Sequence, residues 1–122
     1  GSVPVSAILI TLALTFYTTA TWWEKINGRL KKAHLLFFWL GLIFDTSGTG
    51  LMIKNSTIIG LNLHSLTGYI GILLMLIHTI WATVVLNRRN ETAIMNFHKL
   101  SLVVWSLWIF SYLNGVVLGL SH

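Results

Sequence analysis

The chain has 122 residues, of which 55% are hydrophobic and only 9% are charged, and its mean hydropathy is +0.77. A soluble domain usually carries about 25% charged residues, and so short a chain cannot bury this much apolar surface in one soluble core. The composition therefore argues against a soluble globular enzyme and against a disordered chain, and it indicates a membrane protein. The chain contains no cysteine, which excludes disulfides, thiol nucleophiles, iron–sulfur clusters and thiolate zinc sites.

Four apolar stretches follow one another along the chain, at about residues 3–21, 35–53, 63–86 and 100–120. Each is close to the roughly 20 residues that a helix needs to cross a bilayer. The first stretch ends in a segment typical of an interfacial anchor, Trp22–Lys25, so we interpret it as a span and not as a signal peptide. We interpret residues 1–2 as the remnant of a tag and residues 3–122 as one domain. The sequence thus predicts an all-α, transmembrane, antiparallel four-helix bundle with up-down-up-down order.

The basic residues divide unequally between the polar segments. Four lie in residues 22–33 and three in residues 87–99, whereas residues 54–62 hold only Lys54. The positive-inside rule therefore places segments 22–33 and 87–99 in the cytoplasm and both termini outside. The net charge of +5 is explained by this topology, so we expect no nucleic-acid partner.

Histidines are the residues that a membrane span does not explain, because ionisable groups in a bilayer are costly. His34, His78 and His98 belong to three different predicted helices. We expect the second helix to start near Arg29, the third to end near Asn87 and the fourth to start near Glu91. At 1.5 Å per residue the three histidines then lie roughly 7, 13 and 10 Å from the cytoplasmic ends of those helices. We therefore expect these three imidazoles at similar depth in the cytoplasmic half. His64 lies at the opposite end of the third helix, and the terminal His122 is given no role.

The predicted topology also suggests what these imidazoles bind. The second and fourth helices are diagonal, and diagonal helices leave a wider gap than the about 8–10 Å between adjacent helices. Neutral imidazole is a standard axial ligand of haem iron. We therefore expect haem b as the cofactor, with His34 and His98 as the axial pair and His78 as the alternative iron ligand. A histidine near a helix end can also simply reach the interface, which explains His34 equally well.

The third helix offers a second candidate position. His64 and His78 are fourteen residues apart and share a face with Gly68 and Gly71. This spacing resembles cytochrome-b-type membrane helices, in which one helix carries a ligand for each of two haems. No histidine at the outer level pairs with His64, and small residues are also what tight helix packing needs.

Asp45 is the only acidic residue within a predicted span, eleven residues after His34 and on roughly the same face. We expect it to point into the bundle. A lone buried carboxyl is usually neutralised, which favours a structural hydrogen-bonding role over a role in tuning a cofactor. Candidate partners are Thr46, Tyr69 or a histidine.

Several long motifs resemble one family. These are the segments 25–34 (KINGRLKKAH), 38–49 (FWLGLIFDTSGT), 63–68 (LHSLTG), 75–82 (MLIHTIWA) and 96–99 (NFHK). Together they resemble the HsmA family of small bacterial membrane proteins. The resemblance implies haem binding in the cytoplasmic membrane, in the service of haem sensing and tolerance, and all of His34, His64, His78 and His98 fall in the matching segments.

We therefore favour a haem-binding membrane protein that sequesters haem over a quinone reductase. Two alternatives remain open: a membrane electron-transfer cytochrome b, and a copper or zinc site formed by His34, His78 and His98. A membrane protein without any cofactor is a further class. The expected partners are haem and the lipid bilayer, and the small size of the chain is compatible with a homodimer.

Overall fold

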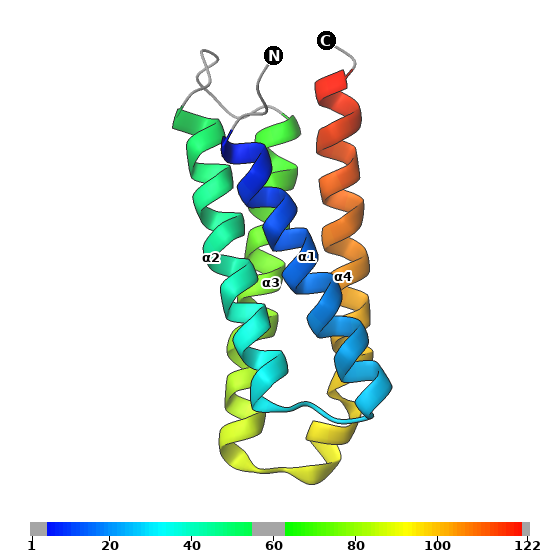
Figure 1. The fold of residues 1–122 in the computed structure, drawn as a ribbon. Helices are drawn as coiled ribbons and strands as arrows, with labels where there is room; N and C mark the ends of the chain where they lie inside the picture. The colour runs from blue at the N-terminus through cyan, green and yellow to red at the C-terminus, as the bar shows by residue number, and fades with distance from the viewer. Residues whose placement is uncertain (1–4, 55–62, 121–122) are drawn as a thin grey trace.

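The computed structural model describes residues 5–54 and 63–120, with side chains described for residues 5–51 and 69–113. These residues form four α-helices: α1 (Val5–Asn27), α2 (Lys32–Lys54), α3 (Leu63–Arg88) and α4 (Glu91–Leu120). Successive helices run antiparallel, and the start of α1 lies at the same end of the bundle as the end of α4 (Figure 1). The predicted all-α, antiparallel four-helix architecture is confirmed.

The four helices pack in a ring. α1 and α3 each contact both α2 and α4, so α2 and α4 lie on a diagonal, as the sequence predicts. The contacts within the hairpins α1–α2 and α3–α4 are extensive, whereas those between the two hairpins are fewer. The bundle is therefore two tight helical hairpins joined by a less extensive interface.

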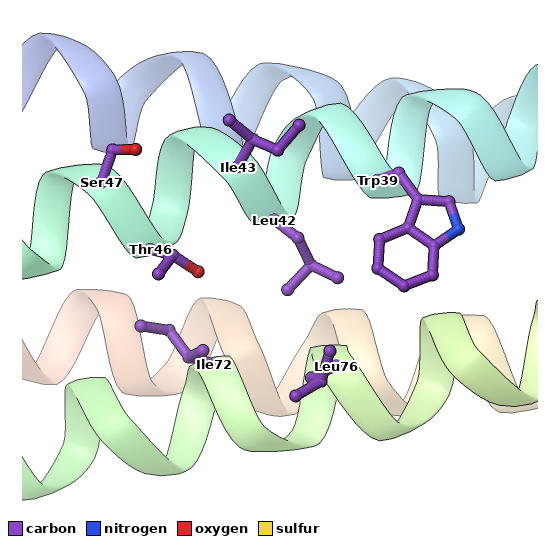
Figure 2. A pocket seen from close by; sticks show the side chains of 7 residues that line it. All are labelled: Trp39, Leu42, Ile43, Thr46, Ser47, Ile72 and Leu76. Atoms are coloured by element: carbon purple, nitrogen blue, oxygen red, sulfur yellow. The ribbon is translucent and has the colours of Figure 1, made fainter.

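A groove on the outside of the bundle marks this interface between α2 and α3 (Figure 2). It has a volume of about 390 Å³ and is lined by Trp39, Leu42, Ile43, Thr46, Ser47, Ile72 and Leu76. None of the described histidines lines it, so the groove is not the site that the sequence predicts.

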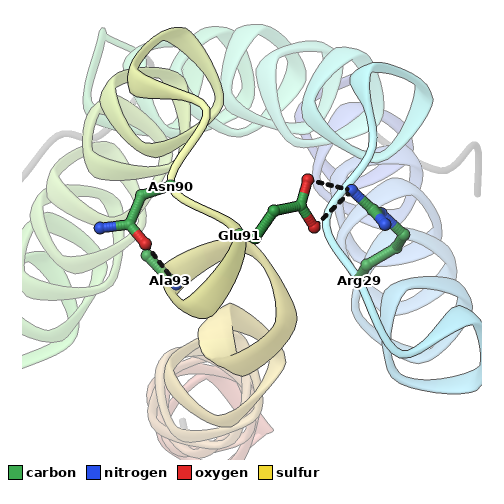
Figure 3. Close-up of polar contacts among 4 residues, drawn as sticks. All are labelled: Arg29, Asn90, Glu91 and Ala93. Atoms are coloured by element: carbon green, nitrogen blue, oxygen red, sulfur yellow. Dashed lines mark hydrogen bonds and ion pairs between the residues drawn. The ribbon is translucent and has the colours of Figure 1, made fainter.

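Two short turns connect the helices at the end of the bundle that carries most basic residues. Gly28 ends α1 with a positive φ of 73°, a conformation that glycine adopts without strain, and its N–H donates to the carbonyl of Glu24. Asn90 caps α4 by accepting a hydrogen bond from the Ala93 N–H at 3.2 Å (Figure 3). Glu91 pairs with Arg29 of the other turn at 2.9 Å, which joins the two hairpins.

Three segments are long and apolar enough to cross a membrane: Val5–Asn27, Tyr69–Arg88 and Glu91–Leu113. α2 has the same length as α1, 23 residues, but contains the polar run 45–50. Large apolar side chains lie exposed on every helix, including Ile8, Ile43, Leu73 and Phe110. An apolar exterior around a small core is the pattern of a multi-pass membrane protein in contact with lipid.

The interior contains two apolar clusters. One surrounds Tyr17, Phe38, Met75 and Trp108 in the middle of the bundle. The other lies toward the two turns and comprises Leu30, Ala82, Val85, Ile94 and Phe97. Buried polar residues lie among these apolar ones, and they form the candidate site.

Candidate functional site

Three polar side chains from three helices form a continuous hydrogen-bonded chain inside the bundle. The Ser101 hydroxyl on α4 donates to Oε1 of Glu24 on α1 at 2.7 Å. Nε2 of His78 on α3 lies 2.8 Å from the same Ser101 oxygen. The exposed fractions of Glu24, Ser101 and His78 are 0%, 1% and 2%. Because the single Ser101 hydrogen goes to Glu24, the Ser101 oxygen accepts the Nε2–H of His78.

Aromatic rings enclose His78 on two sides. The ring of Phe38 on α2 lies 4.6 Å from the imidazole, and that of Phe97 on α4 lies 5.1 Å from it, centroid to centroid. All four helices therefore contribute to this level of the bundle, through Glu24, Phe38, His78 and Ser101. His78 therefore lies in the interior of the bundle, 2% exposed.

His34 is also fully buried, but it serves the start of its own helix. Its Nδ1 accepts a hydrogen bond from the Lys31 N–H at 3.1 Å, as a side chain in the first turn of a capped helix does. The Asn27 amide lies 3.2 Å from Nε2, and Trp23 packs edge-on against the ring. The atom of Asn27 that lies nearest to Nε2 is Nδ2. Because Nδ1 is an acceptor, a neutral His34 carries its proton on Nε2.

His98 has the opposite arrangement of its ring nitrogens. It is half-buried on α4, and its Nδ1 lies 3.0 Å from the carbonyl oxygen of Met95. A carbonyl only accepts, so Nδ1 carries the proton of a neutral ring and Nε2 bears the lone pair. A metal-bound histidine typically has its other ring N–H fixed by a carbonyl in this way. Of the described histidines, His98 therefore has the nitrogen best prepared to bind a metal.

The structure places the three histidines at one end of the bundle but does not bring them into contact. Among the described residues, no three histidine, aspartate or glutamate side chains lie close enough to share a metal ion. The side chains of Glu24, Phe38, His78 and Phe97 are buried in the interior between α2 and α4. The side chains of His64 and His122 lie outside the described residues.

Asp45 forms a second buried polar cluster, nearer the middle of the bundle. Its Oδ2 accepts hydrogen bonds from the Tyr17 hydroxyl at 3.1 Å and from the Trp108 indole N–H at 2.8 Å. The expectation that Asp45 points inward is confirmed, since it is 3% exposed. These two donors come from α1 and α4, because Asp45 faces the centre of the bundle, whereas the candidate partners Thr46 and Tyr69 are exposed.

Four buried side-chain atoms in the described part of the chain have no hydrogen-bond partner in the protein. They are Thr21 Oγ1, Glu24 Oε2, His78 Nδ1 and Thr79 Oγ1. All four belong to Glu24 and His78 or to a threonine on the same helix close to one of them. Buried polar atoms without partners are rare, and they commonly mark bound water or a functional site.

The sequence interpretation missed Glu24 and Ser101. Glu24 was grouped with the interfacial residues beside Trp22, but it is fully buried. The signal was its spacing: Glu24 follows Tyr17 by seven residues and Ala20 by four, on the stripe of α1 that faces the core.

A comparison of the chain with known protein families, with curated proteins and with solved structures finds no match.

Proposed function

We propose that this chain binds haem b within the membrane through histidine side chains and thereby sequesters it. The single observation that carries the proposal is the arrangement of His98, whose Nδ1 faces the Met95 carbonyl and whose Nε2 bears the free lone pair. The resemblance of five segments to the HsmA family supports the same function. Imidazole is the ligand type that b-type haem iron takes, and bound haem supplies one-electron redox chemistry.

His98 is the primary iron ligand in this proposal, and His34 is the second. Nε2 of His34 carries its proton toward Asn27, so His34 must give up its contacts with Asn27 and with the Lys31 N–H to bind iron. His78 is less suited, because its Nε2 is held by Ser101. His34 and His98 therefore remain our proposed pair. His98 can bind iron through Nε2 while its Nδ1 keeps the hydrogen bond to the Met95 carbonyl.

Haem binding also requires the two hairpins to separate locally. Glu24, Phe38, His78 and Phe97 are buried in the closed bundle, and the interface between the hairpins is less extensive than the contacts within them. Opening that interface moves α1 and α2 as one unit away from α3 and α4. This opening costs free energy because it breaks apolar contacts such as those of Leu30, which packs in one cluster with Ile94 and Phe97.

The charge distribution supports a site near the two turns. Lys31, Lys32, Arg88, Arg89 and Lys99 are exposed at this end. They form a positive surface suited to the two propionates of haem. The positive-inside rule places the same end in the cytoplasm, and we propose the bacterial cytoplasmic membrane as the location.

Substitution of His98 tests the proposal. The variant His98→Ala should lose the sharp reduced α band and the shifted Soret band of a six-coordinate haem, and added free imidazole should restore them. His34→Ala should give a five-coordinate spectrum. The matched control is Asn96→Ala, which changes an exposed residue one position before Phe97 on the same helix and should leave the spectrum unchanged. An unchanged spectrum in His98→Ala would rule out this ligand assignment.

A further inference from the structure

The hydrogen-bonded chain of Glu24, Ser101 and His78 has the form of a proton relay. An exchangeable proton lies between each pair of neighbouring groups, at 2.8 Å between His78 and Ser101 and at 2.7 Å between Ser101 and Glu24. The two outer atoms, His78 Nδ1 and Glu24 Oε2, have no partner in the protein. The inner groups of this chain are hydrogen-bonded to each other, and its two outer atoms have no partner in the protein. Such a chain can take up a proton at one outer atom and release one at the other.

We propose that Glu24, Ser101 and His78 form a proton relay across the bundle, from α3 through α4 to α1, completed by bound water at both ends. Ionisable residues inside a membrane commonly serve as such relays. The proposal is independent of haem binding, because it uses only groups that the closed bundle already holds together.

The transfer balances with one proton and no electrons. A proton binds Nδ1 of His78, and the Nε2–H bond breaks as that proton passes to the Ser101 oxygen. The original Ser101 proton passes at the same time to Oε1 of Glu24. At the end His78 is neutral with its proton on Nδ1, Ser101 is a hydroxyl that now donates to Nε2, and Glu24 is a carboxylic acid. The reverse sequence returns the proton.

Two buried threonines near the ends of the relay also have hydroxyl oxygens without a partner. Thr21 precedes Glu24 by one turn on α1, and Thr79 follows His78 directly on α3. Both are 0% exposed, and the hydroxyl oxygen of each has no hydrogen-bond partner in the protein. A buried water typically makes about three hydrogen bonds to such groups. Water held by Thr21 and Glu24, and by Thr79 and His78, would satisfy all four atoms.

The other ionisable groups around Glu24 can be assigned helix by helix. On α1, Lys25 is exposed and lies over the ring of Trp22. On α4, His98 is half-buried and Lys99 is exposed; on α2, His34 is hydrogen-bonded to Asn27 and Lys31. On α3, His78 reaches Glu24 through Ser101. Ser101 is therefore the group through which Glu24 exchanges its proton with His78.

Infrared spectroscopy of the haem-free protein in lipid nanodiscs tests the relay. The chain has only three acidic side chains, Glu24, Asp45 and Glu91, so the carboxylic-acid C=O band can be assigned with Glu24→Gln and with the control Asp45→Asn. We expect a band that titrates with pH, is absent in Glu24→Gln and remains in Asp45→Asn. On transfer to D₂O it should shift at a measurable rate.

Substitutions of Ser101 distinguish a proton relay from a merely structural role of this residue. Ser101→Ala should shift the Glu24 band and slow its deuterium exchange by about tenfold, because the middle of the relay is lost. Ser101→Thr, which keeps the hydroxyl, should restore both, and circular dichroism should show equal helix content in all variants. The proposal is overturned if Glu24→Gln removes no titrating band, or if Ser101→Ala leaves both frequency and exchange rate unchanged. Neither outcome depends on whether the chain binds haem.

Discussion

The Tyr17 hydroxyl on α1 donates a hydrogen bond to Asp45 on α2 at 3.1 Å, deep inside the bundle. The Trp108 indole N–H on α4 donates to the same carboxyl oxygen at 2.8 Å, so one side chain joins three helices. The rings of Tyr17 and Trp108 also pack edge to face at 4.9 Å. The cluster stabilises the contact between the two hairpins. It is separate from the hydrogen-bonded chain of Glu24, Ser101 and His78.

Asp45→Ala should therefore destabilise the bundle. Loss of the carboxyl leaves the buried Tyr17 hydroxyl and Trp108 N–H without an acceptor, which together cost about 2–4 kcal/mol. Asp45→Asn keeps one oxygen and should cost about 1 kcal/mol. The free energy of unfolding, followed by circular dichroism in mixed micelles, measures both. Glu91→Ala is the control: its ion pair with Arg29 is exposed and should contribute less than about 1 kcal/mol. Equal effects of Asp45→Ala and Glu91→Ala would contradict the structural role.

Gly41 lies where α1 and α2 approach closely. A Cβ atom there would overlap the ring of Tyr17, whereas one at Gly50 would meet nothing within 4 Å. Gly41→Ala should therefore destabilise the protein by about 1–3 kcal/mol through overpacking. Gly50→Ala should be neutral or stabilise α2 by up to about 1 kcal/mol, since alanine favours the helix more than glycine does. The same unfolding measurement compares the two, and the idea fails if Gly41→Ala proves the more stable variant.

Leu30 couples the stability of the closed bundle to the proposed opening. It is 1% exposed and packs against residues of α3 and α4. Leu30→Ala should lower the free energy of unfolding by about 2–5 kcal/mol. Because the interface between the hairpins is weakened, haem uptake followed by stopped-flow absorption should also become faster. Leu36→Ala, at a position 57% exposed, is the matched control and should change neither quantity. Uptake at an unchanged rate in Leu30→Ala would argue against hairpin opening.

The direction of insertion can be tested by cysteine labelling, because the chain contains no cysteine of its own. Asn87→Cys lies in the segment that the positive-inside rule assigns to the cytoplasm, and Ser56→Cys lies in the segment assigned to the outside. A membrane-impermeant maleimide should label Ser56→Cys in intact cells and Asn87→Cys only after permeabilisation. The reverse pattern would invert the topology.

Helix number and order were predictable because bilayer-length apolar stretches and short polar segments are strong signals. The helix ends used for the histidine depths were also close: α4 begins at Glu91, where Asn90 caps its polar first turn, and α3 ends at Arg88, next to the expected Asn87. α2 begins at Lys32, three residues after the expected Arg29, because the His34 ring accepts the Lys31 N–H there.

The candidate site was predictable only in part. The inward position of Asp45 followed from helical spacing, but its partners did not, because partners depend on how the helices rotate about their axes. Glu24 beside two tryptophans has the sequence pattern of an interface, yet its position on the core stripe of α1 buries it. The tautomers of His34 and His98 depend on backbone groups within three residues, which sequence spacing alone does not reveal.

The most direct test of the central claim is the absorption spectrum of the purified protein during titration with haemin, recorded oxidised and after reduction with dithionite. Haem binding predicts a shifted Soret band that saturates at a fixed haem-to-protein ratio and a sharp α band on reduction. A spectrum identical to that of haemin in empty micelles, at every ratio, would contradict the claim that this bundle binds haem.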